Sequence, residues 1–265
     1  MTDSFLDDAG NVIKVVPELY EDGLQSTVQE SGKTIALVPK AINAALVPLR
    51  KWIAKQEYSL QETEKLLAEK LKNIPVEKIT TPEGYVGVPA LQAIAYSMDS
   101  EELRELYANL LASAMDTDTK DKVHPSFVEL IKQMSPNDAI VFKIIYEAPV
   151  APVVDLCIRA EPKDGDQGGD FEHVFNITWI KNIPYEKVLI SLDNLLRLGL
   201  IEIPFGLSYA HNENYEIVKS NPEYTLLRQK LEELNRGSIK VDEKVIRKTA
   251  LADSFYETCV KGATS

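Results

Sequence analysis

The chain has 265 residues, of which 45% are hydrophobic and 26% are charged, a composition typical of a folded globular protein and unlike that of a disordered or collagen-like chain. Its two cysteines, Cys157 and Cys259, exclude a disulfide scaffold, and we expect them to be small core residues in a reducing cytosol. With 41 acidic and 29 basic side chains the net charge is −12, which disfavours broad attraction to nucleic-acid phosphates.

Hydrophobic periodicity predicts a mainly α-helical protein with a smaller α+β part. We expect a loosely ordered lead-in over 1–30, where acidic and small polar residues prevail, and an N-terminal helical bundle over 31–134. Residues 135–265 are expected to form a winged-helix-like α+β domain with a C-terminal closing helix. The predicted elements follow in chain order.

The first predicted helix runs from Lys33 to Ile53. Its apolar stripe recurs at three- and four-residue spacings and comprises Val38, Ile42, Ala45, Leu46, Leu49, Trp52 and Ile53. Pro39 suits a first turn, whereas Pro48 predicts a kink or two short helices, because proline removes an amide donor and clashes one turn back.

The next segments contain two helix starts. Ser59-Leu60-Gln61-Glu62 has the form of a capping box and predicts a helix to about Lys72. The prolines and glycines of 80–89 predict a loop that leads into a helix near Ala90. After Asp99, a possible cap, a strongly periodic helix is expected to bury one apolar face and to expose a polar one. The expected buried residues are Leu103, Leu106, Tyr107, Leu110, Leu111 and Ala114, and the expected exposed ones are Glu102, Glu105, Asn109 and Ser113.

The second half alternates helices and strands. Helices are predicted over 123–134, 135–146, 184–198 and 222–234, and strands over 154–159 and 171–179 around a glycine-rich acidic loop at 161–170. Residues 200–203 and 214–218 are predicted to pair as the strands of a wing. The closing helix is expected over 244–260.

One segment departs from the acidic character of the chain. Between residues 33 and 55 there is no acidic side chain, and Trp52 lies among the five basic residues Lys33, Lys40, Arg50, Lys51 and Lys55. Such a basic amphipathic helix can lie on an anionic membrane surface. A core helix whose cationic side faces an acidic neighbour or a protein partner is the favoured interpretation, and Lys40, Asn43 and two prolines argue against a membrane-spanning helix.

A winged helix would present its second helix to DNA. The exposed side of the helix at 184–198 would offer Lys187, Ser191, Asn194 and Arg197. Residues 121–265 carry 17 basic and 22 acidic groups, whereas DNA-reading domains present a positive surface. We therefore expect nucleic-acid binding to be absent and the module to serve protein contacts or self-association.

No complete catalytic or metal-binding motif occurs, so no catalytic residue, metal or cofactor is predicted. The loop Asp164–Asp170 has aspartates at calcium-loop positions but lacks the bidentate glutamate. His124, His173 and His211 lack the helical spacing of paired metal ligands. A triad assembled by the fold from His124, a serine and a carboxylate remains open.

Four stretches resemble the bacterial abortive-infection alpha family, over about residues 31–260. They are Val38-Pro39-Lys40-Ala41-Ile42-Asn43, Val88-Pro89-Ala90-Leu91-Gln92-Ala93, the helix from Glu101 to Ala112, and Val123-His124-Pro125-Ser126-Phe127. Arg104, Tyr107, Asn109 and His124 match the family pattern without a known role. Residues 255–260 look like the family's closing helix, although Leu251-Ala252-Asp253 departs from its usual opening.

The resemblance implies a cytoplasmic bacterial protein that defends against bacteriophage by damaging or arresting the infected cell. We expect a non-enzymatic effector or sensor that acts through protein contacts. The basic segment leaves open a membrane-surface toxin at the inner face of the membrane, and the predicted wing leaves open a transcriptional regulator.

Overall fold

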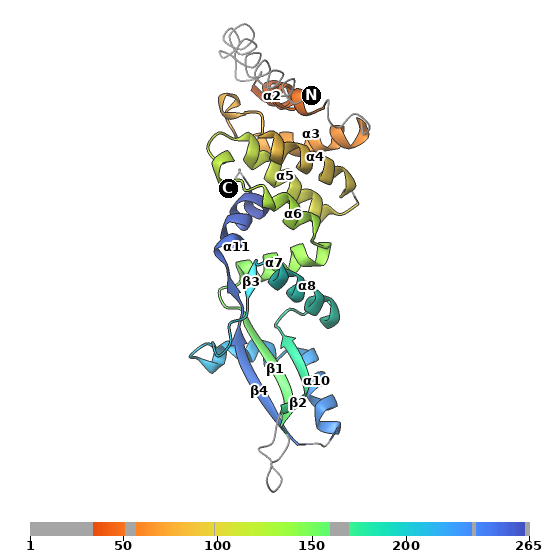
Figure 1. Ribbon diagram of the computed structural model, residues 1–265, viewed down its shortest axis with the longest axis vertical. Coiled ribbons are helices and arrows are strands. Elements are labelled where there is room, and N and C mark those ends of the chain that lie inside the picture. The colour runs from red at the N-terminus through yellow and green to blue at the C-terminus, as the bar shows by residue number, and fades with distance from the viewer. Residues whose placement is uncertain (1–33, 51–56, 98, 160–169, 235–236, 263–265) are drawn as a thin grey trace, which may run out of the picture. The chain divides into compact units, whose positions relative to one another are not determined.

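The computed structural model describes residues 34–50, 57–97, 99–159, 170–234 and 237–262 (Figure 1). The predicted lead-in at 1–30 and the glycine-rich loop at 161–170, apart from Asp170, lie outside these ranges. The described chain is mainly helical with a small antiparallel sheet, as predicted. It divides into two compact units, which we call the helical unit (34–133 with 255–262) and the mixed unit (134–254). The helical unit is therefore discontinuous in sequence and takes in residues that sequence analysis grouped with the α+β part.

The helical unit is built from helices alone in its described part, apart from one isolated β-bridge. Its elements are α2 (Thr34–Arg50), α3 (Glu57–Leu71), η1 (Val76–Lys78), α4 (Gly84–Tyr96), α5 (Glu101–Met115), η2 (Lys120–Lys122), α6 (Ser126–Lys132) and the π-helix η4 (Tyr256–Lys261). Helix α5 packs against α3, α4, α6 and η4, so it is the central helix of this unit.

Burial of α5 on all sides is the main departure from the predicted helix pattern. Every residue from Leu106 to Met115 is buried, including Asn109 at 4% and Ser113 at 2% exposure. The predicted apolar face is buried from Leu106 onward, whereas Leu103 is half-buried, and the prediction that Asn109 and Ser113 face solvent was wrong. The helix is capped by Ser100, whose side chain accepts from the Leu103 amide, and not by Asp99.

Helix α2 packs against α3, α4 and η1. The predicted stripe is buried as far as its side chains are described, at Val38, Ile42, Ala45 and Leu46. The side chains of Leu49, Trp52 and Ile53 lie outside that description. The helix is continuous through Pro39 and Pro48, so Pro39 lies inside it and not in its first turn. Each interior proline costs about 3 kcal/mol, and this cost is opposed by packing of the apolar stripe, in which a fully buried side chain such as Ile42 or Leu46 contributes about 1.5–3 kcal/mol.

Two other helix starts differ from prediction. Ser59 lies inside α3, which begins at Glu57, so the predicted capping box does not start this helix. Helix α4 begins at Gly84 and contains Pro89, although glycine and proline predicted a loop up to that point. Val86, Ala90 and Ile94 are buried at helical spacing, and this packing outweighs the local preference for a loop.

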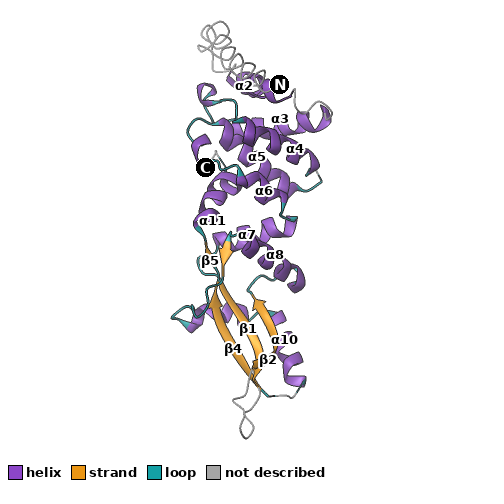
Figure 2. Ribbon diagram, in the orientation of Figure 1, coloured by secondary structure: helices purple, strands orange, loops and turns teal. Residues whose placement is uncertain are grey.

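The mixed unit combines a three-stranded sheet with helices (Figure 2). Its helices are α7 (Pro136–Glu147), α8 (Tyr185–Arg197), η3 (Asn212–Tyr215), α9 (Glu216–Lys219), α10 (Pro222–Glu233) and most of α11 (Ala250–Phe255). Its strands are β1 (Pro152–Arg159), β2 (Asp170–Ile177), β3 (Ile201–Glu202), β4 (Ser238–Val245) and β5 (Arg247–Lys248). The helices predicted at 135–146, 184–198 and 222–234 are confirmed as α7, α8 and α10.

The sheet is antiparallel in the order β2-β1-β4, and β1 is its central strand. Val154, Leu156 and Ile158 of β1 belong to a core that also contains Tyr215 and Val218. Asp155 is buried as well, paired with Lys244 of β4, and its Oδ1 accepts from the Asn176 amide at 2.8 Å. This contact supports the positive φ of 55° at Asn176.

The predicted wing is not formed. Residues 214–218 lie in η3 and α9, and β3 pairs instead with β5 at Arg247–Lys248. Tyr215 and Val218 are both buried three residues apart, which is a helical spacing. The start of the predicted closing helix was also wrong, since Lys244 belongs to β4 and α11 begins at Ala250. Cys157 and Cys259 are free and buried, as expected.

Candidate interaction surfaces

The basic segment at 33–55 is only partly described. Lys33, Lys51, Trp52 and Lys55 lie outside the described ranges, and of Arg50 the structure describes the backbone alone. Lys40 is exposed on α2, whereas the described part of the apolar stripe, from Val38 to Leu46, is already buried in the helical unit. A membrane surface would have to compete with that packing for the stripe. Within the described ranges, no helix is both long and apolar enough to cross a bilayer.

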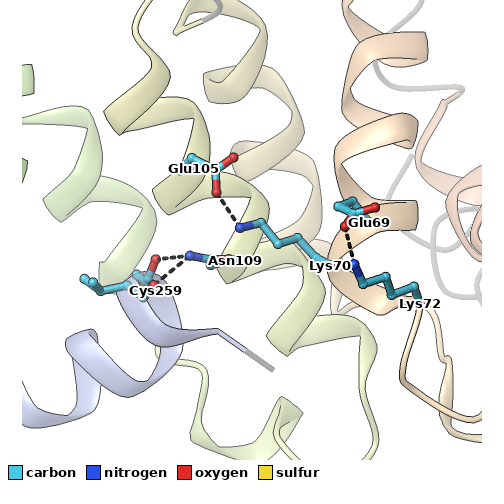
Figure 3. Close-up of polar contacts among 7 residues, drawn as sticks. Glu69, Lys70, Lys72, Glu105, Asn109 and Cys259 are labelled. Atoms are coloured by element: carbon cyan, nitrogen blue, oxygen red, sulfur yellow. Dashed lines mark hydrogen bonds and ion pairs between the residues drawn. The ribbon is translucent and has the colours of Figure 1, made fainter. Parts of the chain in front are cut away.

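A groove of about 740 Å³ lies beside α2. Its apolar lining comes from Val38, Pro39, Ala68, Ile74, Pro75 and Val76, and its polar lining from Lys65, Glu69, Lys72 and Asn73. Lys72 forms an ion pair with Glu69, and Lys70 forms one with Glu105 that joins α3 to α5 (Figure 3). The lining of this groove therefore combines apolar side chains with charges of both signs.

The four residues expected to face DNA do not share one exposed face of α8. Lys187 and Arg197 are exposed, but Ser191 is buried. Asn194 donates to Asp138 Oδ2 of α7 at 2.9 Å and accepts from Arg197. Ser191 and Asn194 are therefore used in packing within the mixed unit, which leaves them unable to reach a base edge.

The four residues that sequence analysis likened to the family pattern have structural contacts where these are described. Tyr107 is buried, its hydroxyl lies 3.5 Å from the Val128 carbonyl oxygen, and burial raises the pKa of its phenol. His124 Nδ1 accepts from the Ser126 amide at 3.1 Å and lies 2.6 Å from Ser126 Oγ. This contact joins residues two apart in the turn that leads into α6, whose N-cap is Pro125. In a catalytic triad, by contrast, a carboxylate orients the ring. Arg104 is half-buried.

Asn109 and Ser113 bind the backbone of the π-helix η4. Asn109 Nδ2 donates to the carbonyl oxygens of Cys259 and Val260, each at 2.9 Å (Figure 3), and Ser113 Oγ donates to the Thr258 carbonyl at 3.0 Å. Carbonyls near a helix C-terminus have no partner within the helix. The two side chains therefore satisfy carbonyls of η4 that would otherwise lack a partner. Sequence analysis missed this role, because periodicity does not show which segment covers a second face.

The Cys259 thiol offers no reactive group at this contact. It is fully buried, and burial raises its pKa well above the usual value of 9.0. The thiolate is the nucleophilic and metal-binding form of cysteine, so Cys259 acts as a small core residue. Across the described ranges, no three His, Cys, Asp or Glu side chains are grouped to hold a metal ion.

The mixed unit exposes several large apolar side chains. They are Phe175, Ile190, Phe205, Leu207, Ile217, Leu226 and Leu234. Phe205 stands out because its exposure is 106% of the reference value. It precedes Gly206, whose φ of 70° turns the chain at the tip of the loop between β3 and η3. No sequence signal separates Phe205 from an ordinary core phenylalanine.

The base of the Phe205 loop is fixed by two tyrosines. The Tyr209 hydroxyl accepts from the Ala151 amide at 2.8 Å, and the Tyr209 amide donates to the Tyr215 hydroxyl, also at 2.8 Å. Tyr215 is fully buried. The loop therefore presents Phe205 to solvent from a fixed base.

A second hollow, of about 360 Å³, lies in the mixed unit. It is lined by Ile144, Trp179, Ile180, Lys181, Asn182 and Ile217. Asn221 holds one wall, since its Nδ2 donates to the carbonyls of Thr178 and Ile180 at 2.9 and 3.3 Å. Asn221 is itself buried, so this wall is built by the core and does not depend on a ligand.

The sequence pattern of a family described as abortive infection alpha matches residues 55–259. The match runs through both units and includes Arg104, Tyr107, Asn109 and His124. Most of the basic segment precedes it. No curated protein and no solved structure matches the chain significantly.

Proposed function

This chain belongs to the abortive infection alpha family, and on that premise we propose that it defends against bacteriophage as a non-enzymatic effector or sensor that acts through protein contacts. The observation that carries the second part is the fully exposed Phe205 on a loop with a fixed base. Exposed aromatic side chains are favoured anchors in protein interfaces, because they bury a large area at a small entropic cost.

The distribution of polar groups supports the same proposal. Tyr107 and Asn109 contact neighbouring segments of the helical unit, and His124 binds the Ser126 amide in the turn before α6. These contacts support the framework of the helical unit, whereas Phe205 of the mixed unit offers an exposed aromatic side chain that a partner can bury. The buried stripe of α2 does not favour the membrane-surface alternative, and the helical conformation at 214–218 does not favour a winged-helix regulator.

A phage challenge tests both parts of the proposal. Bacteria that express the full chain are infected at low and high phage-to-cell ratio, and plaques and surviving cells are counted. We expect fewer plaques, with host death at the high ratio. The Phe205→Ala variant should lose this protection, because truncation of an interface anchor costs about 2 kcal/mol or more. Tyr85→Ala, which truncates an aromatic side chain exposed on α4, is the matched control and should protect fully.

Two outcomes would contradict the proposal. Unchanged plaque counts with the unaltered chain, over a broad phage panel, would argue against a defence role. Full protection by Phe205→Ala would show that this aromatic side chain is not the contact, even if defence itself is observed. Immunoblots of all variants must show equal protein levels for either comparison to hold.

A further inference from the structure

We infer that the partner of Phe205 is a second copy of this chain, and that Phe205 of one copy enters the hollow of about 360 Å³ in the mixed unit of the next. This inference rests on one part of the proposed function, namely that the protein acts through protein contacts. Both surfaces belong to the mixed unit, so the argument needs no relation between the two units.

The hollow suits an aromatic ring in size and chemistry. Ile144, Trp179, Ile180 and Ile217 make its lining largely apolar. Its volume of about 360 Å³ lies at the small end of the range for binding pockets, roughly 300–1,000 Å³. Trp179 offers a ring for an edge-to-face contact with a phenylalanine, an arrangement that aromatic pairs prefer.

The charge of the hollow is compatible with the Phe205 loop. Lys181, the charged residue in the lining of the hollow, is exposed and can lie over the inserted ring in a cation–π contact. The loop from Ile203 to His211, which carries Phe205, has no lysine or arginine. Docking of this loop therefore brings no second lysine or arginine against Lys181.

The occupant must come from another copy. Phe205 is fully exposed in its own chain, so it does not fill the hollow of its own mixed unit. Asn221 holds one wall of the hollow from the core, and Tyr209 fixes the base of the loop. Both partners are therefore preorganised, and little order has to be gained on association. The contact can close as a two-fold dimer, in which each copy inserts its Phe205 into the hollow of the other, or run head-to-tail into a ring or a chain of copies.

The test separates the two halves of the contact. Phe205→Ala removes the inserted side chain and keeps the hollow, whereas Ile217→Glu places a charge in the hollow and keeps Phe205. Ile217 is 45% exposed, so a glutamate can be accommodated without unfolding α9, and circular dichroism checks this. Size-exclusion chromatography with light scattering measures the mass of each protein alone and of their mixture.

The unaltered chain should form species that grow with concentration beyond the monomer mass of 29.6 kDa. Each variant alone should be a monomer. An equimolar mixture should give a heterodimer of about twice that mass, because the phenylalanine of one variant fits the intact hollow of the other and the assembly then stops. Leu226→Ala, which truncates a side chain 46% exposed on α10, is the control and should assemble like the unaltered chain.

Several results would overturn the inference. A monomeric unaltered chain at its highest soluble concentration would do so, as would assembly by either single variant or a mixture that stays monomeric. The phage challenge is a separate readout. Plaque reduction by a monomeric chain would remove the self-association and keep the proposed function, whereas assembly without any effect on plaques would do the reverse.

Discussion

In the helical unit, Asn109 and Ser113 turn polar side chains inward and bind the backbone of η4. In the mixed unit, Phe205 and Ile190 turn large apolar side chains outward. Each departs from the usual distribution of residues in globular proteins, but in opposite directions. A buried polar group with full hydrogen bonding specifies one arrangement of helices, whereas an exposed apolar group marks a surface for contact. Substitutions in the two sets should therefore have separable effects on stability and on assembly.

The largest effect on stability is expected at Asn109. Asn109→Ala removes the donor from the buried Cys259 carbonyl and from the partly buried Val260 carbonyl, which should destabilise the helical unit by about 3 kcal/mol. Hydrogen–deuterium exchange of peptides from α5 measures this as a rise in exchange of roughly a hundredfold. Asn43→Ala on the exposed side of α2 should change exchange little. Equal, small effects of both variants would show that the inward polar contacts do not hold the unit.

A smaller loss is expected at Asn221 in the mixed unit. Its Nδ2 donates to the Thr178 and Ile180 carbonyls, and its Oδ1 accepts from the Glu223 amide at the start of α10. Asn221→Ala should therefore destabilise the unit by about 2 kcal/mol and should raise exchange in residues 178–182. The exposed Asn212 gives the control, since Asn212→Ala removes no described bond to this wall. Unchanged exchange in Asn221→Ala would mean that the hollow is held by other contacts.

Alkaline pH tests inward polar groups in the mixed unit. Burial, and then the charge of Asp155, raise the pKa of Tyr185 from 10.0 to about 12. Because the folded pKa is the higher one, this contribution to stability is complete below about pH 10 and is lost as the pH rises towards 12. Tyr185→Phe should reduce that loss, measured by denaturant unfolding at pH 8 and pH 11. Tyr85→Phe, on an exposed ring, should leave the loss unchanged, and identical losses in both variants would assign it to other groups.

The smallest effect on stability is expected at Phe205. Phe205→Ala removes a side chain that makes no buried contact, so the free energy of unfolding should change by less than about 0.5 kcal/mol. Thermal unfolding at a concentration where the chain is monomeric checks this. A loss comparable to that of Asn109→Ala would show that Phe205 supports its own fold, and the contrast between the two units would then fail.

The sequence predicted helices better than it predicted what covers them. The positions of Leu106, Leu110 and Leu111 follow from periodicity and are buried as expected. The burial of Asn109 and Ser113 depends on a segment about 150 residues away in sequence, which no local pattern reveals. The strand β4 was missed for a related reason. Half of its residues are charged, as suits an edge strand, and a charged stretch with few apolar residues gives a weak strand signal.

The candidate surfaces were the hardest features to predict. Ser191 and Asn194 fall on the helix face expected to be exposed. In the structure Ser191 is buried, and Asn194 donates a hydrogen bond to Asp138 of α7. Phe205 lies beside Pro204 and Gly206, which indicate a turn, but a turn does not tell whether its aromatic side chain packs inward or faces solvent. Whether a side chain is exposed depends on whether a distant part of the chain packs over it, and only the folded structure shows this.

The contact between α5 and η4 also sets an order of events during synthesis. Asn109 leaves the ribosome about 150 residues before the Cys259 carbonyl that it binds, and at about 5–20 residues per second this is a wait of roughly 8–30 seconds. The whole mixed unit is translated in that interval. The first residues of the helical unit are therefore synthesised before the mixed unit and its last residues after it. A nascent chain that stalls before residue 256 lacks η4 and cannot form the contacts of η4 with α5.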